Sequence, residues 1–483
     1  MTPRSNAVPD TGGLPLLIQG GMGVGVSGWR LAQAVGRAGQ MGVVSGTALD
    51  AVFARRLQLG DPGGDMRRAL DSHPWPAMAE RVWRRWWRRE GLDESRAFAA
   101  TPMPAVPLTP EHIDLLVTSA FCEIALARQG HEAPVGINLL EKVQLPTLAI
   151  LLGAILAGVG AVLMGGGIPL SIPGILDRLA AGQAVEQRID VANLAQGEVV
   201  LQTLDPEEIA EAPLTGLVRP LFLGIVSTDG VAKALLRRAS GTVDGFIVEH
   251  HRAGGHNAPP RRAAASGESA GPAYGPKDEA NLEAIQALER PYWLAGGISS
   301  PESVQQALAS GAHGVQVGTA FAACEESGFA PGIKHSLNRH ALSGELCVST
   351  DFRASPTGYP FKISNLPEAR AGYADIDARP RVCDLGYLRT VYRNEDGTVD
   401  YRCPADRMER FLAAGGSPEE IQGRRCLCNG LLAAIGLGQR RGQAGVEQPI
   451  VTLGEDWSAL AVLAGRHGLS YSAADVVRYL LGS

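Results

Sequence analysis

The sequence predicts an α/β protein built as a closed (β/α)8 barrel, and two patterns carry that prediction. First, eight short apolar runs recur along the chain, and helical stretches lie between most of them. Near-continuous apolar strands that alternate with helices indicate a parallel sheet covered by helices. Second, 60 glycines and only 5% aromatic residues suit a chain with many tight strand–helix turns. Eight such strands in series are typical of a barrel of about 250 residues before insertions.

Each expected strand is a short apolar run rich in β-branched or aromatic residues. The expected strands are Leu14–Gln19, Met41–Ser45, Val135–Leu139, Ala161–Met164, Leu221–Val226, Gly245–His250, Tyr292–Ala295 and Gly314–Val317. Helices are expected between most of them, for example at Trp29–Ala38, Asp229–Arg238, Asp278–Leu288 and Pro301–Ser310.

Residues 1–330, which hold all eight strands, exceed the length of a bare barrel, so this region must carry insertions. We expect them near residues 60–111, 185–213 and 259–275. The first contains Trp83–Arg89, an alternation of Trp and Arg that membrane or nucleic-acid binding would also explain. We favour a helix whose Trp edge packs on the barrel while its arginines stay in water. The second is expected to hold a hairpin around Glu198–Leu204, and the third to be a mobile loop.

After about Glu326 the strand–helix alternation stops, and residues 331–483 are predicted to form a C-terminal α+β appendage. Its first part, to about residue 365, is expected to complete the barrel domain. Glu395-Asp396-Gly397 predicts a hairpin turn between Val391–Tyr392 and Val399–Tyr401. Helices are expected at Ala405–Ala414, Gly430–Ile435 and Ala473–Leu481.

Composition and charge exclude several classes of protein. With 45% hydrophobic and 19% charged residues the chain can bury a large core, so it is neither disordered nor fibrous. A net charge of −6 gives no broad positive field for nucleic acid. The uncharged stretch Leu145–Leu176 is interrupted by glycines and prolines, and we interpret it as a buried helix, a turn and a buried strand. The N-terminal residues lack the apolar core of a signal peptide, so we expect a cytoplasmic protein without a membrane partner.

A glycine-rich segment follows the first expected strand. Gly23, Gly25 and Gly28 satisfy the G-x-G-x-x-G pattern of dinucleotide-binding folds. That fold needs an acid at the end of the second strand to hold the ribose, whereas Met41–Ser45 is followed by Gly46-Thr47. The glycines are explained as well by close approach of the backbone to a flat ligand, which is the interpretation we favour.

The sixth expected strand ends in a histidine-rich loop, Glu249–His256. His250 and His251 are adjacent on or near a strand, so we expect them to point to opposite faces and not to share a metal. His256 follows Gly254-Gly255 on the loop at the carboxyl end of the strand, the face where barrel enzymes carry their chemistry. An exposed loop histidine without a role is an equally good explanation of this residue taken alone.

Glycine turns also end the last two strands. Gly296-Gly297 follows the seventh strand, and Gly318-Thr319 follows the eighth. In barrels these two turns often form a phosphate site with the N-terminus of a short helix, because glycines let backbone N–H groups reach the anion. The alternative is that these glycines only make tight turns.

Taken in order, these segments resemble the nitronate monooxygenase (2-nitropropane dioxygenase-like) family. The resemblance rests on Ile18–Gly23, Val135–Asn138, Ala253–His256, Ala295–Ile298, Gly314–Thr319 with Glu326-Ser327, and Ser355–Pro360, and it covers about residues 14–365. Family members are FMN-dependent TIM barrels related to FMN-dependent enoyl-acyl-carrier-protein reductases. The longer C-terminal appendage is similar to that of larger nitronate monooxygenase-like proteins and of polyunsaturated-fatty-acid or polyketide enoyl reductases.

The resemblance implies roles for individual residues. The turn Gly21-Met22-Gly23 would lie beside the flavin ring, and Asn138 would hydrogen-bond near it. Gly255, Gly296, Gly297, Gly318 and Thr319 would hold the FMN phosphate. His256 matches the catalytic histidine, a base or polarising group beside flavin N5. The chain departs from the family at Tyr359, where Arg is usual, and at His250-His251-Arg252, where most members have Gly-Tyr-Glu or Gly-Thr-Glu.

The function that the resemblance implies is FMN-dependent oxidation of alkyl nitronates by O2. The runner-up is an NAD(P)H-dependent FMN enoyl-thioester or quinone reductase on the same barrel. A hypothesis of another class is a flavin-binding scaffold subunit whose appendage recruits a partner. The expected ligands are a small-molecule substrate with O2 or NAD(P)H, and the sequence leaves the oligomeric state open.

The appendage contains Cys383, Cys403, Cys426 and Cys428. Cys383 and Cys403 flank the expected hairpin, and Cys426-x-Cys428 precedes an expected helix, so all four thiols can converge. Four thiolates would suit zinc or an iron–sulfur cluster, but the paired C-x2-C spacing typical of such sites is missing. We therefore predict free, packed thiols and no metal.

Overall fold

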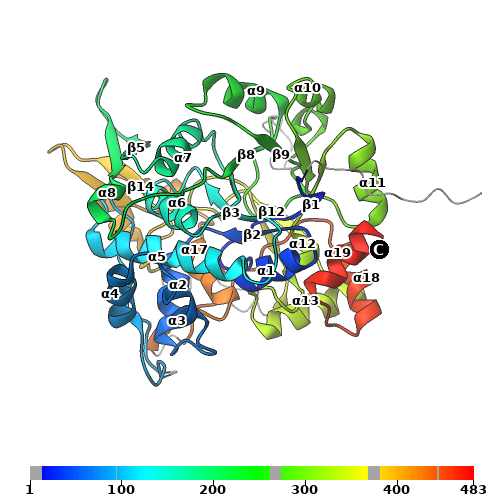
Figure 1. Cartoon of the computed structure of the whole chain (residues 1–483), viewed down its shortest axis with the longest axis horizontal. Helices are drawn as coiled ribbons and strands as arrows, with labels where there is room; N and C mark the ends of the chain where they lie inside the picture. Colours follow the sequence, from blue (N-terminus) through cyan, green and yellow to red (C-terminus); the bar gives the residue numbers. More distant parts are fainter. Residues whose placement is uncertain (1–12, 94, 262–272, 368–380, 443–444, 483) are drawn as a thin grey trace, which may run out of the picture.

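A computed structural model describes residues 13–93, 95–261, 273–367, 381–442 and 445–482. Eight parallel strands close into a barrel in the order β1-β11-β10-β9-β8-β4-β3-β2 (Figure 1). The strands are β1 (Leu17–Gln19), β2 (Met41–Ser45), β3 (Val135–Leu140), β4 (Ala161–Gly165), β8 (Leu221–Val226), β9 (Gly245–Glu249), β10 (Tyr292–Ala295) and β11 (Gly314–Val317). β1 closes the barrel by pairing Leu17 with Val315 and Ile18 with Met41. The predicted fold class is confirmed, and each of the eight expected strands is present.

Two strand boundaries differ from the prediction for physical reasons. β1 begins at Leu17 instead of Leu14, because Pro15 has no N–H to donate to a neighbouring strand. β9 ends at Glu249, and His250 already lies in the turn that follows. Glu249 is therefore the residue that β9 presents at the carboxyl edge of the barrel.

Helices cover the outside of the barrel. They include α1 (Trp29–Arg37), α5 (Pro110–Ala127), α6 (Thr147–Leu156), α7 (Ile172–Ala180), α9 (Asp229–Arg238), α10 (Leu282–Gln286) and α11 (Pro301–Ala309). α10 is shorter than the expected Asp278–Leu288, because Asn281 caps it by accepting a hydrogen bond from the N–H of Ala284. The residues before that cap, Pro276–Asp278, form a separate 3₁₀ turn.

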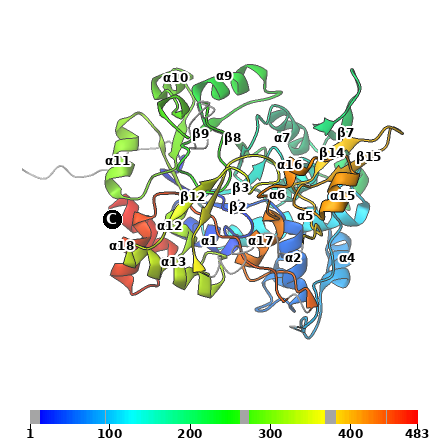
Figure 2. The same cartoon turned by 180° about the vertical axis from the view of Figure 1, so that it is seen from behind.

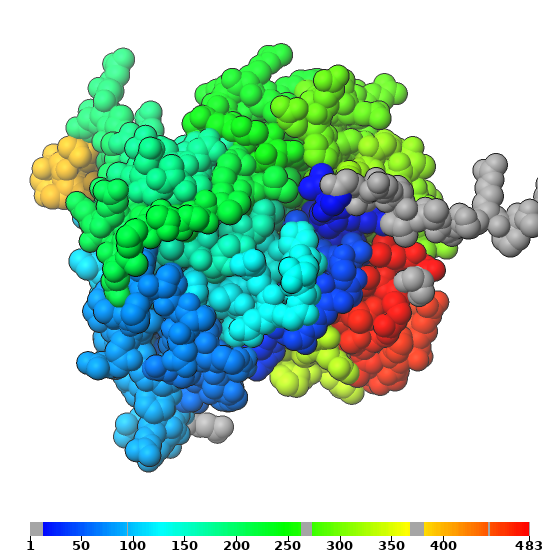
Figure 3. Space-filling view, in the orientation of Figure 1, coloured from blue at the N-terminus to red at the C-terminus, as the bar shows by residue number. Residues whose placement is uncertain are grey.

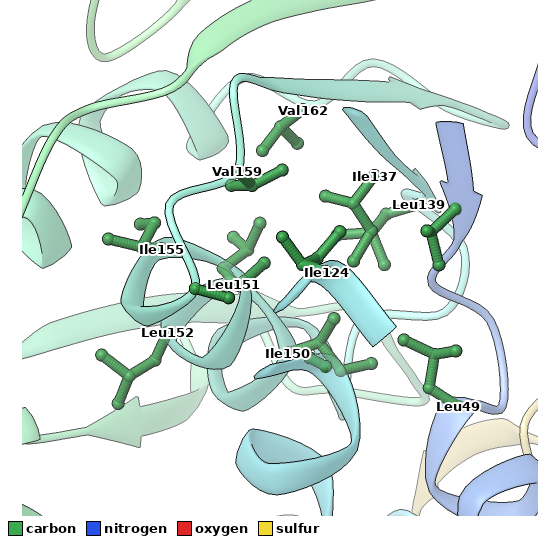
Figure 4. Packing of buried hydrophobic residues seen from close by; sticks show 14 of the residues in the cluster. Leu49, Ile124, Ile137, Leu139, Ile150, Leu151, Leu152, Ile155, Val159 and Val162 are labelled. Atoms are coloured by element: carbon green, nitrogen blue, oxygen red, sulfur yellow. The ribbon is translucent and has the colours of Figure 1, made fainter. Parts of the chain in front are cut away.

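The uncharged stretch Leu145–Leu176 folds as predicted into a buried helix, α6, and a buried strand, β4. Figure 4 shows Ile150, Leu151 and Ile155 of α6 packed with Ile124 of α5 and Ile137 of β3. α6 is apolar on all sides because α5, α7 and the sheet surround it. Among the described residues, no helix has the length and apolar character needed to cross a bilayer.

The first insertion follows α2 (Leu49–Gln58) and forms α3 (Asp65–Leu70) and α4 (Pro76–Trp86). In the Trp/Arg run, Trp86 is buried and Trp83 stacks on Trp87 with ring centroids 4.7 Å apart. Arg84 and Arg85 are exposed and pair with Glu80 and Glu111. The predicted arrangement, with tryptophans packed inward and arginines in water, is confirmed, although α4 ends at Trp86.

The second insertion contains the predicted hairpin, in which β5 (Val185–Ile189) pairs antiparallel with β7 (Val200–Leu204). Between them, β6 (Val191–Ala192) pairs with β14 (Thr390–Arg393), which forms the second predicted hairpin with β15 (Val399–Arg402). The orange hairpin therefore lies against the insertion at one end of the molecule, as Figures 2 and 3 show. A four-residue helix, α8 (Pro206–Ile209), ends the insertion. Most of the expected mobile loop at 259–275 lies outside the described residues.

The C-terminal residues pack on the barrel and share its core. After the short helix α12 (Thr319–Ala322) that follows β11, they form β12 (Val348–Asp351), β13 (Phe361–Ser364) and helices α13 (Pro331–Ser343), α15 (Met408–Ala413), α16 (Pro418–Ile421), α17 (Leu427–Ala434), α18 (Ser458–His467) and α19 (Ala473–Leu481). Figures 1 and 3 show the red α19 against the blue α1, where Val476 and Leu480 join Leu31 and Val35 in one apolar cluster. The boundary near residue 330 stays a prediction.

Candidate functional site

A cavity opens at the carboxyl ends of the barrel strands. All of the predicted site residues line its wall: Gly21, Met22, Gly23, Asn138, Gly255, His256, Gly296, Gly297, Gly318 and Thr319. They come from the turns after β1, β9, β10 and β11 and from β3 itself. The closed barrel brings these segments together because the carboxyl ends of parallel strands share one edge. The G-x-G-x-x-G segment belongs to this barrel wall, and no dinucleotide-binding sheet is formed by the described strands.

Backbone geometry requires glycine in two turns of the cavity wall, at Gly21 and at Gly296-Gly297. A Cβ at Gly21 would lie 2.3 Å from Cβ of Asn138, so only glycine lets the turn after β1 approach β3 this closely. Gly296 and Gly297 have φ of +89° and +82°, a region that residues with a side chain rarely adopt. The cavity wall at these two places is bare backbone, which a flat or phosphate-bearing ligand can approach.

The expected phosphate corner differs in detail from the prediction. α12, which follows Gly318, has only four residues, so its dipole is small and backbone N–H groups must carry any anion contact. The N–H of Gly255 donates to Oγ1 of Thr452 at 2.8 Å and is already used. Arg252 lines the cavity beside Gly297, where a Cβ would lie 3.5 Å from Cδ of the arginine. The guanidinium of Arg252 thus adds a positive charge to this corner.

His256 is held firmly at the cavity wall. Its Nε2 is joined to Oγ of Ser355 by a 2.7 Å hydrogen bond, and Ser355 Oγ is bonded in turn to Oγ1 of Thr357. The ring packs edge-on against Phe361 with centroids 4.8 Å apart. Burial, and then the positive charge of Lys142, lower the pKa of His256 well below its usual value of 6.5. His256 is therefore neutral at physiological pH.

The Ser355–Pro360 segment, which carried part of the resemblance, positions that histidine through Ser355. Tyr359, at the place where arginine is usual, lies under Lys142, whose Nζ is 3.9 Å from the centre of the tyrosine ring. Such a cation–ring contact is favourable when both groups are shielded from water. A cationic side chain is therefore present near residue 359, supplied by a different segment of the chain, although burial lowers the pKa of this amine to about 7.

His250 and His251 do not point to opposite faces, so that prediction is wrong. Their ring centroids are 4.1 Å apart, because both residues lie in the turn after β9 where strand alternation no longer applies. His251 also stacks on Tyr274 at 4.4 Å. Across the described part of the chain, no three His, Cys, Asp or Glu side chains are grouped to hold a metal ion.

Sequence reasoning missed several residues of the cavity wall. Gln316 of β11 and Glu249 of β9 both line it, and both were detectable as polar residues at or near the end of a barrel strand. Oε1 of Gln316 is buried and has no hydrogen-bond partner among the described residues. A buried carbonyl oxygen without a partner indicates a place for a ligand donor.

The far wall of the cavity comes from the C-terminal residues. Tyr387, Leu388, Leu427, Cys428, Leu431, Thr452, Leu453 and Gly454 line it. The N–H of Gly454 donates to Oγ1 of Thr319, which fixes this segment to the barrel. The buried Lys362 of β13 pairs with Glu455 within the C-terminal residues. No motif in the sequence marks these residues, because their approach to the barrel depends on the path of long loops.

The four cysteines of the appendage converge as expected. Cys403 and Cys426 are buried together, and Cys383 and Cys428 pack against them. A hydrogen bond with Cys383, and then burial, raise the pKa of the Cys403 thiol well above its usual value. A hydrogen bond with Cys426, and then burial, do the same for the pKa of Cys428. Protonated thiols in contact agree with the prediction of free cysteines, which stays a prediction.

Comparison with known proteins gives the family that this barrel resembles. The strand-end cavity combines glycine turns after β10 and β11 with a histidine after β9. Residues 175–362 match the family model described as nitronate monooxygenase, which confirms the resemblance. No curated protein matches the chain.

Solved structures similar to this chain are distant in sequence. FabK from Thermotoga maritima is 14% identical with a TM-score of 0.49, over 97% of this chain and 92% of that chain. Nitroalkane oxidase from Streptomyces ansochromogenes is 16% identical with a TM-score of 0.47, over 98% of this chain and 96% of that chain. The enoyl reductase domain of MlnA from the macrolactin biosynthesis cluster of Bacillus amyloliquefaciens is 12% identical with a TM-score of 0.47. The match covers 98% of this chain and 94% of that chain.

Proposed function

We propose that the protein is an FMN-dependent oxidoreductase that oxidises alkyl nitronates with O2. The observation that carries the proposal is the meeting, in one strand-end cavity, of His256 with the glycine turns after β10 and β11. The match of residues 175–362 to the nitronate monooxygenase family supports it.

The residues present fit FMN. Gly296, Gly297 and Gly318 offer bare backbone for a phosphate, and Arg252 offers a positive charge beside them. The amides of Asn138 and Gln316 face the cavity and suit the polar edge of a flat ring; Nδ2 of Asn138 is held by the carbonyl of Leu163 at 3.1 Å. FMN supplies the electron transfer when it is bound.

The residues around His256 suit an anionic substrate. A nitronate is already an anion, so its oxidation needs no base strong enough to remove a proton from carbon. His256 is neutral and fixed by Ser355, so it orients and polarises the substrate as a hydrogen-bonding group. The positive charge of Arg252 favours a negative ligand in this part of the protein. Lys142 adds to it when protonated, since burial lowers the pKa of its amine to about 7.

An anaerobic reduction screen of the purified flavoprotein tests the proposal. NADH, NADPH and an alkyl nitronate such as ethylnitronate are added separately, and the flavin absorbance is followed. Bleaching by ethylnitronate alone is expected. Rapid bleaching by NADH or NADPH would instead favour the enoyl-thioester or quinone reductase. If none of the three compounds bleaches the flavin, and if His256→Ala leaves every measurable turnover unchanged, the scaffold subunit is favoured.

A further inference from the structure

The proposed function does not use the four clustered cysteines of the appendage. Cys403 and Cys426 are buried in one cluster, and Cys383 and Cys428 pack against it. Cys383 precedes β14 and Cys403 follows β15, whereas Cys426 caps the start of α17 and Cys428 lies in its first turn. None of the four is in a disulfide. Separate segments of the chain thus bring four reduced thiols to one place.

The cysteine cluster connects the cavity with a thiol outside the cavity wall. Cys428 lines the cavity and packs in the same apolar cluster as Val24 of the turn after β1. Gly21 in that turn approaches Asn138, so Cys428 lies near the part of the wall that suits a flat ring. Cys383 is only half-buried and does not line the cavity. A set of packed thiols therefore joins the cavity to a cysteine that can be reached from outside it.

Hydrogen bonds divide the cluster into two pairs of thiols. Cys403 bonds with Cys383, and Cys428 bonds with Cys426. These bonds, and then burial, raise the pKa of Cys403 and of Cys428, so these two thiols keep their protons. The partner in each pair is then the sulfur that supplies a thiolate. A thiolate beside a protonated thiol is the arrangement that thiol–disulfide exchange requires.

Neighbouring groups favour a sulfur anion at the second member of each pair. Nδ2 of Asn429 donates to Sγ of Cys426 at 3.4 Å. Cys426 also precedes the first turn of the eight-residue helix α17, whose dipole favours negative charge. The guanidinium of Arg389 interacts electrostatically with Cys383 and with Cys403. Each pair therefore contains one sulfur suited to attack and one suited to give up a proton afterwards.

We propose that the two cysteine pairs form a relay that carries two electrons from an external dithiol to the FMN site. The relay gives the protein a second activity, the oxidation of a dithiol to its disulfide. Cys426 and Cys428 are the pair that meets the flavin, because Cys428 lines the cavity. Cys383 and Cys403 are the pair that meets the external dithiol. The inference rests on the proposed function for bound FMN and for O2 as the final electron acceptor.

Each step of the relay exchanges two electrons. The S–H bonds of Cys426 and Cys428 break, a disulfide forms between these residues, and two electrons and two protons go to oxidised FMN. The thiolate of Cys383 attacks this disulfide and Cys403 completes the exchange, which restores both thiols of the first pair and leaves a Cys383–Cys403 disulfide. The external dithiol reduces that second disulfide by the same exchange and leaves as its own disulfide. O2 takes the two electrons and two protons from the flavin and becomes hydrogen peroxide.

Mass spectrometry tests the sulfur chemistry without a measurement of turnover. The purified protein is oxidised with diamide, unfolded, alkylated and digested. A disulfide is expected within each pair, Cys426 with Cys428 and Cys383 with Cys403, and each disulfide lacks the two hydrogens of its thiols. Four alkylated thiols after oxidation would overturn the proposal. About one zinc per chain held by four thiolates would also overturn it, because no thiol would then be left to carry electrons.

Anaerobic reduction of the bound FMN by dithiothreitol tests the electron transfer. The flavin of the wild type should bleach at least about 10-fold faster than free FMN does. Cys426→Ser and Cys383→Ser each break one pair and should slow the bleaching by about 10-fold. Cys347→Ser is the matched control, because Cys347 is exposed and lies outside the cluster. Wild-type bleaching no faster than that of free FMN, or an undiminished rate in either pair variant, would overturn the relay.

Ethylnitronate separates failure of the relay from failure of the proposed function. Cys426 does not line the cavity, so ethylnitronate should still bleach the flavin of Cys426→Ser, which also shows that this variant is folded and loaded with FMN. Cys426→Ala, which places no hydroxyl in the buried cluster, repeats the test if the serine variant does not fold. Bleaching by dithiothreitol but not by ethylnitronate would support the relay and contradict nitronate oxidation. Bleaching by ethylnitronate alone would support nitronate oxidation and overturn the relay.

Discussion

The two walls of the cavity are built by different parts of the chain and in different ways. The wall made by the barrel consists of residues at strand ends, and its predicted members all lie there, from Gly21 to Thr319. The opposite wall consists of residues such as Tyr387, Leu427 and Thr452, which follow no repeated pattern in the sequence. The barrel wall is mostly backbone and fixed polar groups, whereas the C-terminal wall adds apolar side chains. In the proposed function, the first wall would hold the ligand and the second would shield it from water.

The largest expected effect tests the barrel wall at Gly318. Gly318→Glu should abolish FMN loading, because a carboxylate there would repel the phosphate and fill its place. The measurement is the ratio of flavin to protein after purification. Gly318→Ala is the control: Gly318 has φ of −110° and a Cβ would meet only Met22 at 3.6 Å, so FMN loading should be retained. A Gly318→Glu protein that is purified with one FMN per chain would contradict the proposal that Gly318 lies at the phosphate of FMN.

The second prediction concerns His256 on the same wall. His256→Asn should retain FMN but lose turnover of ethylnitronate by about 10²-fold, because a fixed hydrogen-bonding group at the substrate is lost. Since the pKa of His256 lies well below 6.5, the wild-type nitronate rate should show no step from this residue at neutral pH. Steady-state rates from about pH 6 to about pH 9 check both expectations. Joint loss of flavin and fold would point to a structural role.

These residues show what the sequence could and could not predict. His256, Gly296 and Gly318 follow strands whose apolar pattern is clear, and the barrel then places them together. Glu249 was within reach of the same reasoning, since an acid that ends a barrel strand is itself a signal. The error at His250 and His251 came from extending β9 by one residue, which changed the expected direction of their side chains. The place of Thr452 in the cavity wall could not be predicted from the sequence, because the loops that carry this residue have no periodic pattern.

The third prediction tests the C-terminal wall at Thr452, where a smaller effect is expected. Thr452→Val removes the acceptor of the Gly255 N–H, a hydrogen bond worth about 1 kcal/mol. FMN affinity should fall about fivefold, measured by titration of the apoprotein with FMN. Thr452→Ser keeps the hydroxyl and should bind as the wild type does. Equal affinity in Thr452→Val would mean that this wall only covers the ligand.

The smallest effect is expected at the thiols of the C-terminal residues, of which Cys428 belongs to the C-terminal wall. The pKa of Cys403 and of Cys428 is raised by hydrogen bonds to their neighbours and by burial, so these thiols stay protonated near neutral pH. Alkylation requires the thiolate, so Cys347, which is exposed, should react with iodoacetamide first. Mass spectrometry of labelled peptides over time gives the order, and Cys347→Ser should remove the fast phase.

Elemental analysis of untagged protein completes this test. Free thiols predict no bound metal, whereas about one zinc per chain, held by four thiolates, would require the four cysteines to close around it. Cys428 lines the cavity, so a metal there would also make the C-terminal wall rigid behind the ligand. Labelling that becomes fast for Cys403 and Cys426 only after a chelator is added would equally contradict free thiols. The comparison of the two walls would then change, because the C-terminal wall would be fixed by coordination as the barrel wall is fixed by its strands.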